Sequence, residues 1–116
     1  MTVYVDDVRH PFGRMVMCHL WADTEAELLA MVDRIGVDRR WYQRPPKASW
    51  HHFDISLSKK AAAIAAGAVL TDRYGPVEHV ARLHIASGIP DVVAHGERRL
   101  AMVVEARGRA AKAVLL

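Results

Sequence analysis

The chain has 116 residues, of which 52% are hydrophobic and 25% are charged, so it fits one compact folded domain and not a disordered segment. Sixteen Lys and Arg residues against 13 Asp and Glu give a net charge of +3, which favours anionic partners without demanding nucleic acid. The single cysteine, Cys18, excludes an internal disulfide and a zinc site built from several thiolates.

Three features of the chain predict a soluble, cytoplasmic protein without a membrane partner. The N-terminal sequence MTVYVDD is acidic and lacks the basic and apolar regions of a signal peptide. No apolar run reaches the roughly 18 residues that a membrane-spanning helix needs. A lone cysteine also fits a reducing compartment.

The first elements in chain order are two predicted strands. Residues 2–6 combine β-branched and aromatic side chains before a doubled aspartate, which indicates a short strand. Pro11 and Gly13 then predict a turn. Residues 15–22, MVMCHLWA, are apolar at nearly every position, as is typical of a strand covered on both faces.

A helix is predicted between Thr24 and Gly36. Thr24 with Glu27 three residues later forms the pattern of a capping box, and Gly36 stands where a helix commonly ends. The apolar residues between them repeat at helical spacing: Leu28, Met31, Val32 and Ile35.

The next segments predict a loop, a strand, a helix and a last short strand. The loop covers residues 37–48 and ends in two prolines, and the strand covers residues 50–55. The helix covers residues 58–66 with Ser58 as its N-cap, and residues 68–71 form the short strand.

This order of elements predicts the α/β class, as a small sandwich of a short mixed sheet with packed helices plus a helical C-terminal tail. The tail is Ala- and Arg-rich, and its break at residues 88–90 predicts two helices. We expect residues 1–75 to form the α/β domain and residues 76–116 to form an extension packed on it. The tail helices also offer a surface through which a homo-oligomer would form.

Side-chain alternation along the strands predicts a polar cluster on one face of the sheet. Each strand has one mostly aliphatic face and one face that mixes aromatic with ionisable side chains. If the strands are registered accordingly, the second set meets in a cleft of Asp6, His19, His52 and Asp54, framed by Tyr4, Trp21 and Trp50.

Imidazole and carboxylate groups in a cleft suit either acid–base catalysis or metal binding near neutral pH. The catalytic candidates are His19, His52, Asp54 and Asp6, the metal-ligand candidates are Asp6, His19, Asp23, His52 and Asp54, and Trp21 and Trp50 would line the ligand. No spacing matches a known metal signature, so a divalent metal is a candidate cofactor and no more. The alternative is that the histidines are structural hydrogen-bond partners and that Asp23 helps to begin the helix.

A second candidate site lies at the start of the helix after residue 55. Lys59 and Lys60 stand in its first turn, where the helix dipole disfavours cations, so a bound anion would relieve the conflict. With Ser56 and Ser58 they would hold a phosphate or carboxylate. The alternative is that both lysines point into solvent.

The segment RRWYQRPPK is basic and aromatic. Its basic side chains, such as Arg40, could contact phosphates while its aromatic side chains, such as Trp41, stack on a base, which would allow nucleic acid binding. We favour the alternative, a loop whose aromatic rings cover the core edge while its arginines stay solvated.

Six segments in order carry a resemblance to a known family: MTVYVDD, MCHLWAD, AELLAMVDRIGV, RWYQ, HHFDIS and SKKAAAIAAGAV. Over residues 2–69 the chain resembles a family of short bacterial and phage proteins known as a domain of unknown function. Its members are similar in carrying VYVD, then HL-AD, then HYD, which here reads HFD. The resemblance implies that Asp6, His19, Asp23, His52 and Asp54 belong to the shared pattern. It brings no activity, cofactor or partner.

Two functions follow, and the sequence does not decide whether the protein is an enzyme. The leading hypothesis is that the cleft binds a phosphorylated or otherwise anionic small molecule and hydrolyses it with metal help. The alternative is a non-enzymatic module that binds nucleic acid or another protein.

Overall fold

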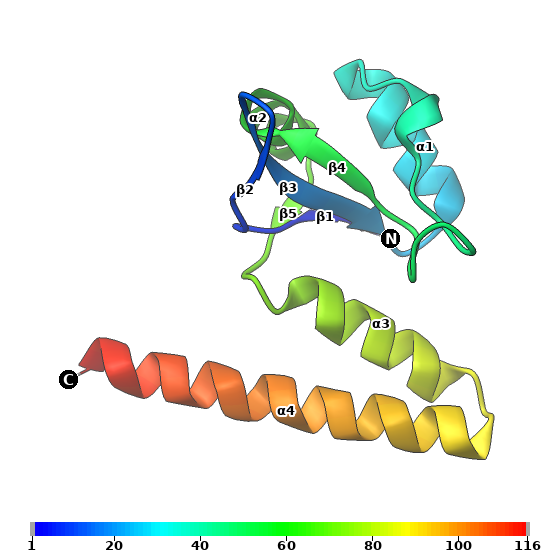
Figure 1. Ribbon diagram of the computed structural model, residues 1–116, viewed down its shortest axis with the longest axis vertical. Helices are drawn as coiled ribbons and strands as arrows, with labels where there is room; N and C mark the ends of the chain where they lie inside the picture. Colours follow the sequence, from blue (N-terminus) through cyan, green and yellow to red (C-terminus); the bar gives the residue numbers. More distant parts are fainter. Residues whose placement is uncertain (1, 116) are drawn as a thin grey trace. The chain divides into compact units, whose positions relative to one another are not determined.

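A computed structural model describes residues 2–115 and confirms the predicted α/β class (Figure 1). The chain divides into two compact units with the boundary between Arg73 and Tyr74. The first unit holds the sheet and two helices, and the second holds two further helices. Within residues 2–115, no helix combines the length and the hydropathy needed to cross a membrane.

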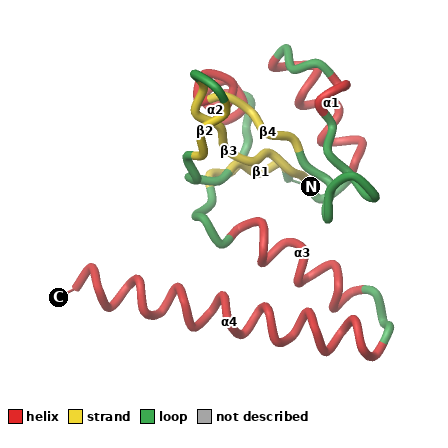
Figure 2. Tube along the Cα trace, viewed as in Figure 1, coloured by secondary structure: helices red, strands yellow, loops and turns green. Residues whose placement is uncertain are grey.

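The sheet of the first unit is mixed and is organised around one long strand, β3 (Figure 2). Antiparallel pairing joins β3 to β1, β2 and β4, and β1 pairs with β5 in parallel. The strands are β1 (Val3–Val5), β2 (His10–Phe12), β3 (Met15–Ala22), β4 (Phe53–Ser56) and β5 (Val69–Leu70).

Strand β2 lies where the sequence predicted a turn, and that prediction is wrong. The turn is confined to two residues around Gly13, whose φ of 60° suits a glycine, so residues 10–12 pair with β3. Pro11 is tolerated because β2 pairs with β3 alone and has an open edge, where a missing N–H costs no ladder hydrogen bond.

Helix α1 (Glu25–Ile35) has the predicted boundaries because its signals are local. The Thr24 hydroxyl accepts the Glu27 backbone N–H at 3.2 Å and donates to the Glu27 carboxylate at 2.8 Å. Gly36 ends the helix with φ 78°.

Helix α2 (Leu57–Ala65) begins earlier than predicted, and its N-cap is Ser56 instead of Ser58. Strand β4 runs directly into the helix, so Ser56 is the last extended residue and its Oγ accepts the Lys59 N–H at 3.3 Å. The Ser58 hydroxyl hydrogen-bonds to that same Oγ at 3.1 Å.

The core of the first unit lies between one face of the sheet and the helices α1 and α2. Cys18, Leu20, Phe53 and Ile55 supply the sheet side of it and are at most 2% exposed. Leu28, Val32 and Ala63 cover them from the two helices. The other face of β3 and β4 is therefore left to the polar set.

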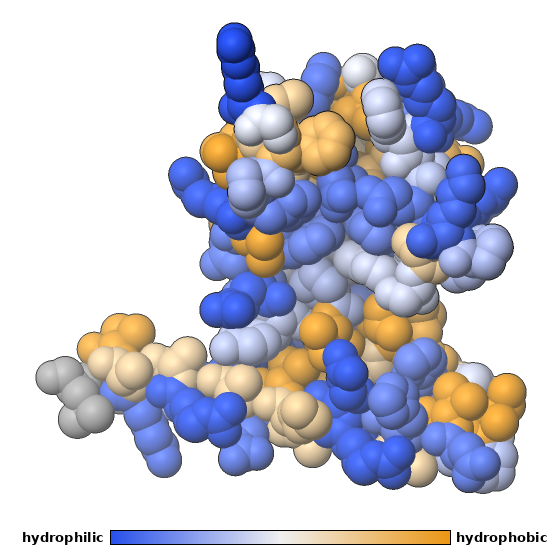
Figure 3. Space-filling view, viewed as in Figure 1, coloured by the Kyte–Doolittle hydropathy of each residue, from blue (hydrophilic) through white to orange (hydrophobic). Residues whose placement is uncertain are grey.

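The second unit is a helical hairpin of α3 (Gly75–Ala86) and α4 (Pro90–Leu115), with the break that the sequence predicted. The helices approach closely at Gly96, where a Cβ would lie 2.6 Å from the Ala81 carbonyl oxygen. Arg107 Nη1 donates to Glu78 Oε2 at 2.7 Å across the pair. Apolar side chains are visible over these helices in Figure 3, and the exposed ones include Leu83, Ile89, Met102 and Val104. The predicted oligomer through these helices stays a prediction.

Candidate metal centre

The polar cluster is set by the register between β3 and β4. Cys18 pairs with Ile55 and Leu20 with Phe53, and these four residues point into the core. His19 lies between them and pairs with Asp54, so this pair points to the opposite face.

Strand β2 brings a third ionisable side chain to that face. The backbone pairing places His10 opposite Met17, two residues before His19 on β3. The rings of His10 and His19 lie 5.3 Å apart between centroids. One potential ligand atom from each of His10, His19 and Asp54 lies within 4.8 Å of the other two.

The carboxylate of Asp54 is the centre of the group. Its Oδ1 lies 3.8 Å from Nε2 of His10 and 3.8 Å from Nε2 of His19. Nε2 of His52 lies 3.6 Å from the same oxygen, although His52 does not belong to the mutually close group of three. The side chains of His10, His19 and Asp54 are 34%, 25% and 27% exposed, so the group is reached from solvent.

Two atoms of this group are buried without a hydrogen-bond partner: Asp54 Oδ1 and His10 Nε2. Leaving such a polar atom unsatisfied costs about 1–3 kcal/mol, so native proteins rarely keep one without a reason. Asp54 is itself held in place, because its other oxygen, Oδ2, accepts a hydrogen bond from Gln43 Nε2 at 2.5 Å. A cation between these atoms would satisfy both.

Asp6 orients His19. It is fully buried, and its Oδ2 lies 2.6 Å from His19 Nδ1 while its Oδ1 accepts the His19 backbone N–H at 3.0 Å. A carboxylate at this distance keeps the proton on Nδ1 and turns the Nε2 lone pair to the cluster. Asp6 therefore orients a candidate ligand, His19, and is not itself in the group of three.

His52 is oriented in the same way by the main chain, because its Nδ1 lies 3.1 Å from the Trp50 carbonyl oxygen. Burial lowers the pKa of His52, so its imidazole stays neutral near pH 7. The hydrogen bond that His19 donates to Asp6 raises the pKa of His19 against the opposing effect of burial. A metal at His19 would therefore compete with a proton that is held more tightly than usual.

An aromatic wall borders the cluster. Trp50 stacks on His52 with ring centroids 4.2 Å apart and an interplanar angle of 12°. Trp21 meets Trp50 edge-on at 5.7 Å, and Tyr4 stacks on Trp21 at 5.7 Å. Trp21 is 1% exposed, so of the two tryptophans only the half-buried Trp50 offers surface to a ligand.

Asp23 lies outside the group. Its Oδ2 accepts the Thr2 backbone N–H and its Oδ1 accepts the Tyr4 hydroxyl, both at 3.0 Å. These contacts tie the start of β1 to the end of β3. The role of Asp23 that the structure displays is thus structural.

The remaining predicted binding residues lie in two other places. Lys59 Nζ donates to the Ile35 carbonyl oxygen at 2.8 Å, so its ammonium already has an acceptor at the end of α1. Lys60 follows it on α2. Arg40 and Trp41 lie in a short 3-10 helix, η1 (Arg39–Trp41), where the guanidinium covers the indole at 4.8 Å.

Sequence reasoning missed His10 and Gln43. Pro11 suggested a turn and so hid the strand that carries His10, although Gly13 and Arg14 form a two-residue link between two extended segments. Gln43 reaches Asp54 because residue 43 forms an isolated antiparallel bridge with residue 52. Nothing in the local sequence indicates that long-range bridge.

With this geometry described, the comparison with known families is informative. Residues 3–84 match the family described as "Protein of unknown function (DUF4031)". The chain belongs to this family. No curated protein and no solved structure gives a significant match.

The DUF4031 match covers the whole sheet and every residue of the cluster, and it ends within α3. It therefore extends beyond residue 69, where the resemblance seen in the sequence stopped, and it leaves α4 outside. The polar cluster is a feature of the part of the chain that defines family membership.

Proposed function

We propose that this chain binds a divalent transition metal ion through His10, His19 and Asp54, and that the metal assists hydrolysis of a phosphorylated or otherwise anionic small molecule. The observation that carries the proposal is a pair of buried atoms without a hydrogen bond, Asp54 Oδ1 and His10 Nε2, which lie 3.8 Å apart at ion-pair distance. A metal ion is the partner that suits a carboxylate oxygen and an imidazole nitrogen at once.

Zinc is the best fit to this set of ligands. Zn–N and Zn–O bonds of about 2.0–2.2 Å in tetrahedral geometry place neighbouring ligand atoms roughly 3.4 Å apart. The two distances from Asp54 Oδ1 to the histidines are 3.8 Å each, and all three ligand atoms lie within 4.8 Å of one another, so the side chains would have to move closer together to complete the coordination. Three protein ligands leave a position for water or substrate, as catalytic zinc sites require.

The chemistry would be hydrolytic. A metal with two neutral imidazoles and one carboxylate keeps a net positive charge, which attracts an anion and polarises a phosphoryl oxygen. Water adds to phosphorus, the bond from phosphorus to the leaving oxygen breaks, and that oxygen takes a proton, so no oxidant or reductant is needed. His52, with Nε2 3.6 Å from Asp54 Oδ1, stands where it would accept the proton from the attacking water.

Metal binding is the first experiment. Metal-free protein is titrated with Zn²⁺ by calorimetry, and we expect one site per chain in the wild type and loss of that site in His10→Ala. His10 suits the test because it lies on a three-residue edge strand, so its truncation leaves the core intact. The matched control is His51→Ala, because His51 is adjacent to the cluster but contacts Tyr42 at 2.9 Å instead. Equal zinc binding in both variants contradicts the proposal.

Hydrolysis is the second experiment, with bis(p-nitrophenyl) phosphate and p-nitrophenyl phosphate as probes. Activity should disappear with a chelator and return with Zn²⁺. His52→Ala should keep the metal and lose roughly 100-fold or more in kcat. Zinc binding without turnover of either probe would instead favour the alternative function, a non-enzymatic module that binds nucleic acid or another protein.

A further inference from the structure

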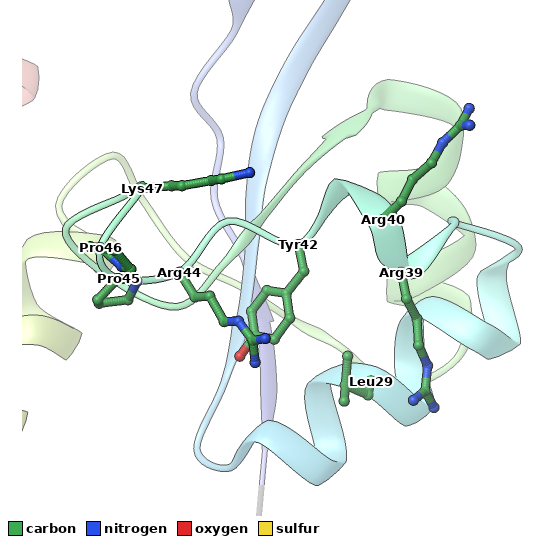
Figure 4. Close-up of a pocket in the computed structure, with 8 residues that line it drawn as sticks. All are labelled: Leu29, Arg39, Arg40, Tyr42, Arg44, Pro45, Pro46 and Lys47. Atoms are coloured by element: carbon green, nitrogen blue, oxygen red, sulfur yellow. The ribbon is translucent and has the colours of Figure 1, made fainter.

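A second hollow in the first unit has a different chemistry from the metal centre. It has a volume of about 450 Å³ and lies between α1 and the loop after η1 (Figure 4). Four of its eight lining residues are cationic, and none is acidic: Arg39, Arg40, Arg44 and Lys47. Leu29, Tyr42 and two prolines supply the apolar part. The volume falls within the range of small-ligand pockets.

The basic hollow and the metal centre lie on opposite sides of the extended segment of residues 42–44. Gln43 reaches Asp54, whereas its neighbour Tyr42 stacks on the core residue Phe53 at 5.0 Å with an interplanar angle of 8°. Successive side chains of an extended segment alternate, so Tyr42 and Arg44 both face away from Asp54. The basic hollow and the metal centre are therefore separate sites.

The four cations differ in how far acidic partners neutralise them. Arg40 Nε lies 3.7 Å from Asp38 Oδ2, and the Arg40 guanidinium covers the Trp41 ring at 4.8 Å. Arg39 makes two hydrogen bonds to the Asp33 carboxylate, at 3.0 and 2.7 Å, and is committed to that pair. Arg44 lies 3.9 Å from Glu25, which is a loose ion pair, and its guanidinium covers the Tyr42 ring at 5.3 Å. Lys47 has no ion pair among residues 2–115 and is exposed.

Arg44 and Lys47 thus keep donors for a ligand. Figure 4 shows the Arg44 side chain lying along Tyr42, and Lys47 leaving the same loop in a different direction. The guanidinium offers planar paired donors to a phosphate, and the flexible stem of the exposed Lys47 would have to turn its ammonium to the same phosphate as a point charge. Trp41 lies between the lining residues Arg40 and Tyr42; the Arg40 guanidinium covers its ring at 4.8 Å, and the 56% exposed side chain leaves aromatic surface for a base.

We infer that the basic hollow binds the phosphate group of a nucleotide, free or within a single strand, through Arg44 and Lys47. The site is independent of the metal centre and of the hydrolysis proposed there. A nucleotide fits better than inorganic phosphate alone, because the hollow combines cations with apolar and aromatic surface.

The test measures binding of AMP and inorganic phosphate by calorimetry, and of fluorescein-labelled (dT)10 by anisotropy, to the full chain. The variants are Arg44→Ala/Lys47→Ala and a control of equal charge, Arg98→Ala/Lys112→Ala, whose two residues lie on α4. We expect the first to weaken AMP binding by roughly tenfold or more and the control to stay within about twofold. Circular dichroism and the melting temperature establish that both are folded.

The outcomes separate the two sources of phosphate and separate this site from the metal centre. Binding of AMP with the expected pattern identifies a free nucleotide, and the same pattern with (dT)10 alone identifies a nucleic acid strand. Either pattern should survive a chelator and the variant His10→Ala, even if the metal proposal fails. No binding of any probe, or equal losses in the two double variants, would overturn the inference.

Discussion

The fully buried Asp6 carboxylate contacts His19 twice, at the ring Nδ1 over 2.6 Å and at the backbone N–H over 3.0 Å. The Asp6 side chain thus holds both the β3 backbone at His19 and the imidazole ring of the same residue. The Nε2 of that imidazole is left facing Asp54 at 3.8 Å. The proposed metal centre depends on this relationship. If the His19 imidazole were free to rotate, the site would lose most of its affinity for the metal.

The first prediction is that Asp6→Asn weakens Zn²⁺ binding by about 10- to 100-fold while the protein stays folded. Asparagine keeps the shape of the side chain but removes the charge that supports His19. Calorimetry gives the affinity, and Asp7→Asn is the control because Asp7 is the exposed neighbour. Unchanged affinity in Asp6→Asn would show that the Asp6–His19 contact has a purely structural purpose.

The sequence predicted those features that depend on local signals. Thr24, Glu27 and Gly36 fix both ends of α1 through contacts within four residues of each end, so its boundaries are as predicted. Strand alternation likewise sufficed to place His19 and Asp54 on one face, because their neighbours Leu20 and Ile55 are buried in the core on the other face.

Features that depend on tertiary contacts could not be predicted. The ammonium of Lys59 donates a hydrogen bond to the Ile35 carbonyl oxygen, 24 residues away at the end of α1. No local sequence pattern indicates this contact between two helices. Asp23 is a residue type that commonly binds metals, yet both of its carboxylate oxygens accept hydrogen bonds, one from the Thr2 backbone N–H and one from the Tyr4 hydroxyl. His10 was missed since proline is rare in strands and only the open edge of β2 accommodates it.

The second prediction concerns the reactivity of Cys18. Its side chain is fully buried, and burial together with the nearby Asp6 charge raises the pKa of the thiol to about 11. The thiolate is the reactive species, so the native protein should resist Ellman's reagent and react with one equivalent only after unfolding in guanidinium. A Ser58→Cys variant, with an exposed position, should react at once with one equivalent in the native state. Rapid labelling of the native wild type would contradict the packing of the core.

The third prediction is a pH dependence at Glu78 in the helical hairpin. Burial raises the pKa of Glu78, but hydrogen bonds and charge from Arg107 and Arg82 outweigh it, so the pKa ends below the usual 4.5. A lowered folded-state pKa stabilises the fold above the unfolded value, and this contribution is lost as pH falls through the folded value. We expect about 1 kcal/mol between wild type and Glu78→Gln at pH 6, shrinking toward pH 3.

Chemical unfolding followed by the helical circular dichroism signal, at several values of pH, measures that difference for Glu78. Glu97→Gln is the control, since Glu97 is an exposed carboxylate on α4 without an ion pair among residues 2–115. Its difference from wild type should be near zero throughout. A difference for Glu78→Gln that grows on acidification would contradict the assigned direction of the pKa.

The fourth prediction compares two glycines of α4 that have the same helical backbone but different surroundings. A Cβ at Gly96 would lie 2.6 Å from the Ala81 carbonyl oxygen and 2.9 Å from His84 Cβ, so Gly96→Ala must push the helices apart. Overpacking costs about 1–3 kcal/mol, more than the roughly 1 kcal/mol that alanine gains over glycine in a helix. A Cβ at Gly108 meets nothing within 4 Å, so Gly108→Ala should gain the full stabilisation that alanine has over glycine in a helix.

Thermal and urea unfolding of the full chain should therefore move in opposite directions for the two variants. Gly96→Ala should lower the melting temperature of the helical signal, and Gly108→Ala should raise it by an amount equivalent to about 0.5–1 kcal/mol. Because both substitutions add one methyl group to the same helix, a general effect of helix propensity would stabilise both. Stabilisation by Gly96→Ala would mean that α3 and α4 do not touch at Ala81, and the hairpin would have to be packed differently.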